Sequence, residues 1–301
     1  MANIQGWINL YKPKNISSFK AVNSLKKKFF LKKIGHAGTL DPLAEGVLPI
    51  AVGKTTKLIP FITNELKTYN FTIYWGAQTT TDDSDGEVLF KSDHLPKIDD
   101  IKSKINNFIG YIKQIPPKVS AVKVNGERAY KLTRNNKHFN ILPKDVFVKN
   151  LRIIDHNHTK TTFEIICGKG FYVRSFARDI SIKLKTFGHI SSLERTKVGK
   201  FTKKTSILLD DLVKISQRLT DINCFKSSIS MLDDILAYEI ENDKDLKDLS
   251  FGRSIIIDGK KNFNKAPSSI GDKIVFLSYQ GDIVSIGKLV GNLFKPNKIL
   301  L

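Results

Sequence analysis

The sequence predicts an α/β protein of the α+β class, in which a large mixed domain is followed by a small β-rich module. Helical and strand-like patterns both occur up to about residue 240, whereas short strand-like runs dominate the remainder. Apolar residues make up 41% of the 301 residues, which is enough for a large packed domain and a smaller one. We therefore expect one domain at residues 1–240 and a second at 241–301.

The segment 17–33 predicts an amphipathic helix with a lysine-rich end. Ser17 or Ser18 can cap its first turn, and Gly35 follows its end. Its apolar residues recur at helical spacing and are Ala21, Val22, Leu25 and Phe29.

The stretch YNFTIYWG at residues 69–76 predicts a β-strand, because every second residue is large and apolar. These residues are Tyr69, Phe71, Ile73 and Trp75. The acidic turn TTTDDSDGE follows the strand. The turn resembles a calcium-binding EF-hand loop, which needs carboxylate ligands at its first and twelfth positions. In that register Thr81 and Ser92 would stand at these positions, and neither is a carboxylate. We therefore expect a solvated hairpin end there.

The remaining elements follow in order along the chain. Residues 115–134 form a basic excursion that begins with prolines, and TTFEIICGKGFYVRSF at 161–176 predicts a strand that bends at its glycines into a helix. Helical patterns follow in ILLDDLVKI and ISMLDDILAYEI, at 207–215 and 229–240. The tail contains the strand-like runs SIIID, KIVFLSY and DIVSIGKLV.

The charge balance indicates a polyanionic partner. There are 49 Lys and Arg against 29 Asp and Glu, a net charge of +20, and such an excess attracts RNA or DNA. The apolar runs are too short to span a bilayer and the first residues lack a signal-peptide pattern, so we expect a soluble cytoplasmic protein without membrane contact. Cys167 and Cys224 form no CxxC pair and are expected in the core.

Several catalytic or ligand-binding motifs are absent or incomplete. AVGKTT resembles the end of a phosphate-binding P-loop, but Leu48 stands where that motif needs a glycine. His156 and His158 lack nearby partners for a metal site and are expected at the surface. There is no GxSxG elbow and no cysteine placed beside a histidine, so the common nucleophilic triads are excluded.

Asp41, within GHAGTLDPLAEGVLP, is the strongest catalytic candidate. Pro42 holds Asp41 in an extended conformation, and nearby glycines let another chain approach closely. Lysines 26, 27, 28, 32 and 33 precede it and favour an ionised carboxylate, which suits a nucleophile. The alternative is a turn aspartate that bonds its own backbone.

The segment GHAGTLDPLAEGVLPIAVGKTTKL at 35–58 resembles the signature of the bacterial tRNA pseudouridine synthases that modify uridine 55 in the TΨC loop, the TruB family. Further blocks resemble this family in the same order: INLYKPKNISSFKAV, KTYNFTIYWGAQTTTDDSDGEV, PPKVSAVKVNGERAYKLTR, KGFYVRSFARDI and SSLERTKVGKF. The resemblance implies a pseudouridine-synthase fold with a central mixed, mainly antiparallel sheet flanked by helices. It also implies an RNA-gripping insertion at about 117–145 and a PUA-like RNA-binding tail.

The resemblance implies roles for individual residues. Asp41 would be the nucleophile, or the base that opens a glycal route, and Arg174 would pair with it from the same strand face as Tyr172. Tyr69 would stack on the flipped uracil and help to remove its C5 proton. Tyr172 and Leu193 would line the uracil pocket, and His36 would fill the space that the nucleotide leaves. Four residues would support the site or contact phosphates: Lys12, Pro13, Lys67 and Lys123.

The same resemblance implies no cofactor, no metal and no guide RNA. The expected partner is the T-arm stem-loop of tRNA, bound by a monomer. All proposed catalytic residues precede residue 200, so the tail is expected to contribute affinity rather than chemistry. Three departures from the family pattern stand out, at Phe171, Glu194 and the turn Asn135–Asn136; an asparagine tolerates the left-handed conformation that a turn glycine would adopt.

Two other function classes remain open from the sequence. A tRNA-binding or folding protein could use the same surface without catalysis. A hydrolytic nucleoside glycosylase would need paired carboxylates, for which Asp41 and Glu45 are the nearby candidates. Glu45 fits a turn or surface residue better.

Overall fold

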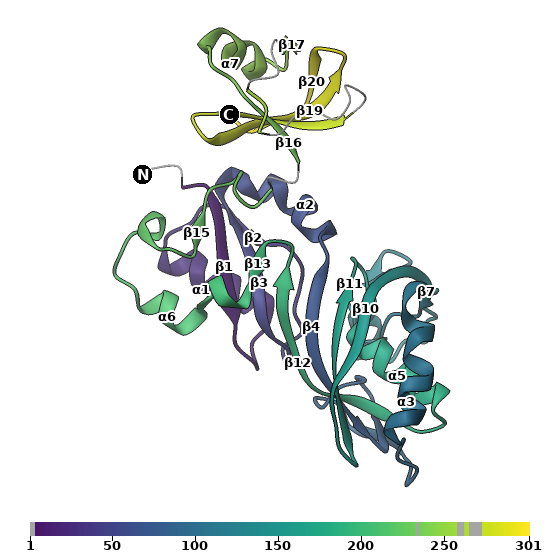
Figure 1. Cartoon of the computed structure of the whole chain (residues 1–301). Helices are drawn as coiled ribbons and strands as arrows, with labels where there is room; N and C mark the ends of the chain where they lie inside the picture. The colour runs from purple at the N-terminus through teal and green to yellow at the C-terminus, as the bar shows by residue number, and fades with distance from the viewer. Residues whose placement is uncertain (1–3, 233–234, 258–261, 265–272) are drawn as a thin grey trace.

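The computed structural model describes residues 4–232, 235–257, 262–264 and 273–301 (Figure 1). A large twisted sheet runs through the first part of the chain. Its main path is β14 (Ile207–Leu208), β1 (Gly6–Lys12), β3 (Glu45–Val52), β12 (Gly188–Val198), β4 (Lys67–Trp75), β11 (Lys160–Cys167), β10 (Lys144–His156) and β7 (Gly110–Gln114). The strands β2 (Ile34–His36), β13 (Phe201–Thr202) and β15 (Phe225–Lys226) pair at its side.

Strand directions in this sheet confirm the expected mixed, mainly antiparallel arrangement. Among the described pairs, β1 with β14 and β3 with β12 are parallel, and the others are antiparallel. The alternation predicted around residue 71 is present in β4, where Tyr69, Phe71 and Ile73 are all buried. The β4 strand lies between β12 and β11 and so carries its side chains into the middle of the fold.

Short helices flank the sheet. They are α1 (Ser18–Lys28), α2 (Ile59–Asn64), α3 (Ile98–Ile105), α5 (Val173–Lys183) and α6 (Leu209–Lys214), with 3₁₀ turns η1 (Gly53–Leu58), η2 (Asn106–Phe108), η3 (Lys203–Thr205) and η4 (Leu219–Asp221). Two further helices lie away from this sheet, α4 (Ala129–Arg134) in the insertion and α7 (Asp243–Ser250) in the tail. Figure 1 shows α3 and α5 beside β10 and β11. Phe176 of α5 packs edge-on against Phe71 and Phe163, at 5.6 and 5.7 Å between ring centroids, which anchors α5 over the centre of the sheet.

The helix predicted at 17–33 is shorter than expected. Ser17 caps it by accepting a hydrogen bond from the Lys20 amide at 3.2 Å, but the helix ends at Lys28. Phe30 adopts φ 51°, a left-handed conformation that cannot continue a right-handed helix.

The predicted strand, bend and helix at 161–176 is confirmed, with one correction. The β11 strand ends at Cys167, the chain turns through Gly168–Gly170, and α5 begins at Val173. Tyr172 is therefore the N-cap residue of α5 and Arg174 lies in its first turn, so the two do not share a strand face. The side chain of Gln114 bonds both the amide and the carbonyl of Tyr172, at 2.8 and 3.1 Å, and holds that residue extended.

A second sheet forms the tail, in the order β16 (Leu236–Glu239), β18 (Lys273–Tyr279), β19 (Asp282–Val290), β20 (Leu293–Ile299) and β17 (Ile255–Ile256). The strand-like runs predicted after residue 250 are confirmed where they are described; Asp258 lies outside the described residues. The helix predicted at 229–240 is wrong. Leu236, Ala237 and Tyr238 are buried and pair with β18 as a parallel strand, because that pairing covers their side chains in the tail core.

The tail sheet packs against the large body. Phe276 of β18 meets Phe61 of α2 edge-on at 4.9 Å between ring centroids, and the Lys57 ammonium donates to the Ile299 carbonyl. Ala237, Ile283 and Phe276 share an apolar cluster with Trp7 and Ile62. Removing the tail would therefore expose core side chains of the first part of the chain.

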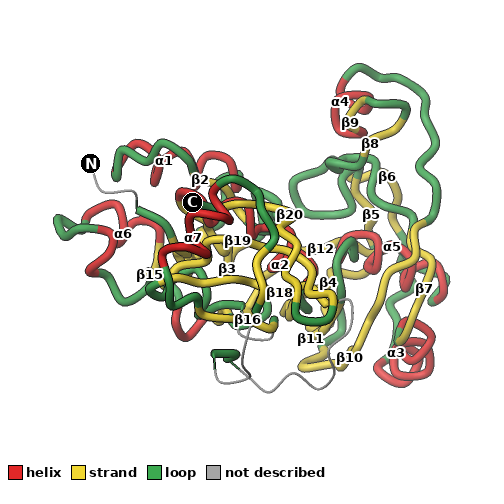
Figure 2. Tube along the Cα trace, turned by 90° about the horizontal axis from the view of Figure 1, so that it is seen from above, coloured by secondary structure: helices red, strands yellow, loops and turns green. Residues whose placement is uncertain are grey.

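The insertion at 117–145 contains the small hairpin of β8 (Lys123–Val124) and β9 (Glu127–Arg128), followed by α4. Figure 2 shows this group projecting at one corner of the molecule. Ala129 and Leu132 are buried within it, while Lys123, Glu127 and Arg128 are exposed. Among the described helices, no segment has the length and apolar content needed to cross a bilayer.

Candidate active site

A cavity of about 260 Å³ lies where the loop before β3, the strand β4, the insertion and the start of α5 meet. Six of the predicted site residues line it: Asp41, Lys67, Tyr69, Tyr172, Arg174 and Leu193. They come from positions up to 152 residues apart in the chain (41 to 193). Lys12, His36 and Lys123 lie outside the lining. The fold thus brings the predicted acid, aromatic and guanidinium groups to one hollow.

Asp41 lies at the mouth of this cavity and is paired with Arg174. Its Oδ2 is 2.9 Å from Arg174 Nε, and 35% of the Asp41 side chain is exposed against 5% for Arg174. The carboxylate therefore remains accessible while a buried cation orients it. This geometry supports a reactive group rather than a turn residue that bonds its own backbone.

The loop that carries Asp41 is held from both sides. Ser18 accepts a hydrogen bond from the Leu40 amide and donates one to the Leu40 carbonyl, at 2.8 and 2.9 Å. The Asn15 amide donates to the Pro42 carbonyl at 2.8 Å. The carboxylate thus lies between two anchored residues, which restricts its position.

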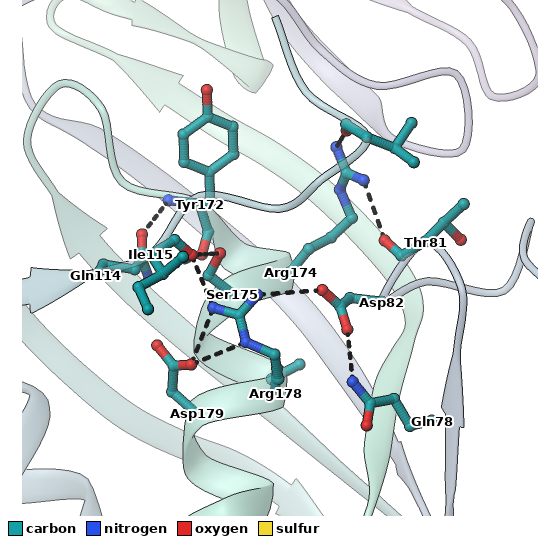
Figure 3. A network of polar contacts seen from close by, with 12 residues as sticks. Gln78, Thr81, Asp82, Gln114, Ile115, Tyr172, Arg174, Ser175, Arg178 and Asp179 are labelled. Atoms are coloured by element: carbon teal, nitrogen blue, oxygen red, sulfur yellow. Dashed lines mark hydrogen bonds and ion pairs between the residues drawn. The ribbon is translucent and has the colours of Figure 1, made fainter. Parts of the chain in front are cut away.

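Arg174 is fixed by four groups. Its Nη1 and Nη2 donate to the carbonyls of Thr81 and Val119, both at 3.1 Å, and Figure 3 shows the Thr81 contact. Nε also lies 3.6 Å from Oδ2 of Asp83, in addition to its contact with Asp41. Nε makes no aligned hydrogen bond to another described residue, so both carboxylate contacts are ion pairs. One guanidinium therefore links an accessible carboxylate to a buried one.

The acidic turn at 79–87 is not the solvated hairpin end that we predicted. Asp82 and Asp83 are only 8% and 4% exposed, although β5 (Ala77–Thr79) and β6 (Val88–Lys91) do form a hairpin around them. The Ile190 amide donates to the Asp82 carbonyl at 3.1 Å and draws the turn onto β12. The turn thereby places Asp83 against Arg174.

A second arginine of α5 holds the same turn. Arg178 Nη1 lies 3.5 Å from Asp82 Oδ2, and Gln78 donates to the other oxygen of that carboxylate at 3.1 Å (Figure 3). Burial raises the pKa of Asp82 above its ordinary value. Arg178 also donates to the Ile115 carbonyl at 2.7 Å, so α5, the turn and the segment that leads into the insertion are tied together at this point.

Tyr69 lies in the cavity wall beside Arg195, a residue that we did not predict. The Arg195 guanidinium is 6.0 Å from the Tyr69 ring centroid, a cation–π contact. Arg195 is 1% exposed and donates to the carbonyls of Gly38 and Val47 at 2.9 and 2.8 Å. Burial raises the pKa of Tyr69, which keeps the phenol neutral near pH 7.

Lys12 and Lys67 support the site from within the protein. Lys12 is fully buried, and its ammonium donates to the carbonyls of Pro13 and Ile16 at 2.8 Å each. Lys67 donates to two carbonyls before β4 at 2.7 and 2.8 Å. Burial lowers the pKa of each to about 8. Lys12 has no exposed surface, so of its two predicted roles it can support the site but cannot contact a phosphate.

The other predicted residues take different positions. Lys123 is exposed at the hairpin of the insertion. His36 is half-buried in β2, and burial together with Arg195 lowers its pKa, so its imidazole is neutral near pH 7.

Two of the departures from the family pattern have local explanations. Asn136 has φ 51°, the left-handed turn conformation that an asparagine tolerates. Glu194 accepts a hydrogen bond from Tyr11 at 2.7 Å and forms an ion pair with Lys203, so two neighbouring side chains satisfy its carboxylate.

The described residues contain no group of three His, Cys, Asp or Glu side chains placed to hold a metal ion. Cys167 and Cys224 are free thiols in the core, as predicted. The ionisable groups that line the cavity are the Asp41 carboxylate, two phenols, two guanidinium groups and two ammonium groups, from Tyr69, Tyr172, Arg174, Arg195, Lys67 and Lys169.

Comparison with known proteins places the chain in a family. The solved structure of a Cbf5-Nop10-Gar1 complex superposes on 98% of this chain and 85% of the other, with a TM-score of 0.73 and 23% identity, which shows a shared fold. A family profile described as "TruB family pseudouridylate synthase (N terminal domain)" matches residues 26–173.

The relatives named tRNA pseudouridine synthase B include those of Ehrlichia chaffeensis and Rickettsia bellii. That of Ehrlichia chaffeensis is 51% identical over 209 residues, covering 69% of this chain and 71% of the relative. That of Rickettsia bellii is 37% identical over 298 residues, covering 97% of both. With the profile match and the shared fold, these similarities show that the chain belongs to the TruB family of pseudouridylate synthases.

Proposed function

We propose that this protein isomerises uridine to pseudouridine in tRNA, at position 55 of the TΨC loop, and that Asp41 carries the reaction. The observation that carries the proposal is the accessible Asp41 carboxylate, 2.9 Å from a buried guanidinium at the mouth of a cavity walled by Tyr69. The relatives named tRNA pseudouridine synthase B and the net charge of +20 support an RNA substrate.

The reaction exchanges one glycosidic bond for another. The bond from C1′ to N1 breaks, the detached uracil rotates, C5 bonds to C1′, and the proton lost from C5 is balanced by one taken up at N1. Asp41 either attacks C1′ or removes a sugar proton to open a glycal route; both roles require an ionised carboxylate. The Arg174 guanidinium at 2.9 Å orients the carboxylate toward the cavity lining. The uridine and its product have the same atoms and oxidation state.

The cavity suits a single extruded base. Tyr69 offers a neutral ring for stacking, and Leu193 and Tyr172 add apolar surface that excludes water. Extruding a loop nucleotide costs a few kcal/mol, and stacking of a base on an aromatic ring offsets about 1–3 kcal/mol of this. The half-buried His36 is available to fill the space that the base leaves in the loop.

The direct test is to incubate the protein with an unmodified tRNA transcript and with its isolated T-arm stem-loop, without added cofactor or metal, and to map pseudouridine. We expect a single modified position in both RNAs. A transcript with cytidine at position 55 is the control and should remain unmodified. Binding of both RNAs without any pseudouridine would instead support the non-catalytic tRNA-binding function.

We also propose that the chain acts as a monomer without a guide RNA, gripping the T-arm with the insertion at 117–145. This insertion is basic and reaches the cavity, because Ser120 and Ala121 line it and the Val119 carbonyl accepts from Arg174. We propose in addition that the tail sheet is the PUA-like RNA-binding module, with its boundary near residue 240.

The insertion is expected to close on RNA. Ala129 and Leu132 are its buried apolar anchors, and its β8 and β9 strands have two residues each. Amides at 117–145 should therefore exchange rapidly in the free protein and gain at least about tenfold protection when the T-arm binds. Hydrogen exchange followed by mass spectrometry measures this, with α5 as an internal reference. Equal protection in both states would indicate a preformed rigid loop.

The tail is expected to contribute affinity. Lys288 and Lys295 are exposed and directly opposite each other in β19 and β20, an arrangement of like charges that a bound phosphate would relieve. Replacing both with glutamine should weaken tRNA binding and reduce the dependence of log Kd on log salt by about 1–2. The single-turnover rate at saturating tRNA should change less than about twofold. A large fall in that rate would contradict the division between tail and site.

A further inference from the structure

A second and larger cavity lies beside the basic end of α1. Its volume is about 550 Å³, and its lining comes from Phe29–Lys33, from Val52–Lys54 and from Ile4, Gln5 and Arg218. It shares no lining residue with the cavity at Asp41. None of the predicted site residues lines it.

The lining of this cavity is cationic. It contains Lys32, Lys33, Lys54 and Arg218 and no carboxylate. Arg218 pairs with Asp221 at 3.0 Å, whereas the three lysines make no ion pair with any described residue. Three more lysines in the last turn of α1, at 26–28, lie next to it in sequence. Unpaired positive charge around an apolar hollow favours an anionic partner with an apolar face.

Phe30 is the unusual residue of the lining. Its side chain is 84% exposed and its φ is 51°, a conformation that a bulky side chain rarely adopts. The fold imposes this conformation, because the neighbouring Leu31 is buried and its amide donates to the Lys26 carbonyl at 3.0 Å. A left-handed residue commonly ends a helix and is usually glycine; here it is an exposed aromatic ring, which offers a surface for stacking.

The floor of the cavity is bare backbone. Gly53 has φ 64°, and a Cβ built on it would lie 2.4 Å from the Ile4 carbonyl oxygen. The Gly53 amide donates to the Lys33 carbonyl at 2.9 Å, which ties the floor to the lysine pair. A side chain at position 53 would collide with the Ile4 backbone, so this part of the lining must be glycine.

We infer that this cavity, which we call the α1 pocket, binds a nucleotide of the RNA substrate outside the reacting uridine. A base would stack on Phe30, and the flanking phosphates would lie against Lys32, Lys33 and Lys54. Stacking on an aromatic ring next to lysines is the usual chemistry of sequence-independent RNA contact. The inference rests on the proposed function for the identity of the RNA.

The chain path allows one RNA to reach both cavities. Lys33 and Gly38 are joined by the strand β2 and one further residue, so their Cα atoms are at most roughly 17 Å apart. Gly38 lines the cavity at Asp41. The α1 pocket is therefore close enough to contact nucleotides near the uridine that enters the site, and its contribution should appear in binding rather than in the chemical step.

Replacing Phe30 with glycine separates a binding role from a structural one. Glycine adopts φ 51° without strain, so we expect the melting temperature to stay unchanged or rise. Loss of the stacking surface should weaken binding of an unmodified full-length tRNA transcript roughly 5- to 100-fold. The single-turnover rate at saturating RNA should remain within about twofold of wild type. Tyr111→Ser, at a ring that is 82% exposed on β7, is the matched control and should leave binding unchanged.

A charge variant tests the phosphate contacts. Lys32→Gln with Lys33→Gln should lower the slope of log Kd against log salt by about 1–2, whereas the control Lys149→Gln with Lys160→Gln, at exposed positions of β10 and β11 outside the insertion, should not. Wild-type affinity in the Phe30→Gly variant, or a loss of melting temperature and rate along with affinity, would overturn the inference.

The two proposals fail in different ways. If the wild-type protein binds tRNA but forms no pseudouridine, the proposed function fails while the binding comparison still tests the α1 pocket. If wild type forms pseudouridine and both pocket variants bind tRNA normally, the α1 pocket is not an RNA site. A third outcome would also overturn the inference. If the variants bind tRNA with wild-type affinity while an acidic, apolar peptide binds the wild-type pocket, the partner of the α1 pocket is a protein.

Discussion

Replacing Asp41 with asparagine is expected to abolish isomerisation while tRNA binding is kept. Asparagine preserves the size of the side chain and most of its hydrogen bonding but removes the negative charge that both proposed routes require. Tritium at C5 of the target uridine should be released to water by wild type and not by the variant, a loss of more than about 10⁴-fold in rate. Affinity for tRNA should be unchanged or slightly higher, because an anion near phosphates is lost.

The matched control is Glu45→Gln, which removes a nearby half-buried carboxylate that pairs with Lys14 at 3.3 Å and lies outside the cavity lining. It should retain tritium release. Near-normal release by the Asp41 variant would make Asp41 a turn residue and would remove the basis of the proposed mechanism. Loss of activity in the Glu45 variant, with Asp41 intact, would favour a mechanism with paired carboxylates.

Replacing Arg174 with methionine is expected to damage both folding and catalysis. Asp83 has 6% of its side chain exposed and would lose its cation, and removing one partner of a buried ion pair costs about 3–5 kcal/mol of unfolding free energy. Asp41 would lose the group that orients it, and the rate should fall roughly 10²- to 10³-fold. Denaturant titration and tritium release measure the two effects.

A double variant separates these effects. Asp83→Asn combined with Arg174→Met removes the buried carboxylate that was left without a cation, so most of the lost stability should return. Catalysis should not return, because Asp41 still lacks its guanidinium. Recovery of activity in the double variant would show that Arg174 serves folding alone. The coupling is testable because Asp83 and Asp41 contact the same Nε atom, at 3.6 and 2.9 Å.

The contact between Arg174 and the insertion connects the proposed closure on RNA to the position of Asp41. Arg174 donates to the Val119 carbonyl, and Ser120 and Ala121 line the cavity. Closure of 117–145 over the T-arm would therefore act on the guanidinium that orients Asp41. The hydrogen-exchange experiment tests the closure itself.

Local patterns in the sequence were sufficient for several elements of the fold. The alternation at 69–76 defined β4, because every second side chain of a strand points to one face. The serine before residue 18 defined the start of α1, and the glycines after Cys167 marked the turn into α5. The family motifs were sufficient to identify Asp41, Tyr69 and Arg174 as neighbours in one site. Each of these conclusions depends on side chains close in sequence or on a motif already known to act together.

Only the tertiary structure decided the surroundings of that site. Asp83 read as a solvated turn residue and is instead buried against Arg174, 91 positions further along the chain (174 − 83), because the turn is pulled onto β12. Arg195 supports the Tyr69 ring and the loop before Asp41 from another strand, and Leu236–Glu239 became a strand because β18 covers it. Whether a charge or a strand is buried depends on tertiary contacts with residues distant in sequence. Local helix and strand propensities do not identify those residues.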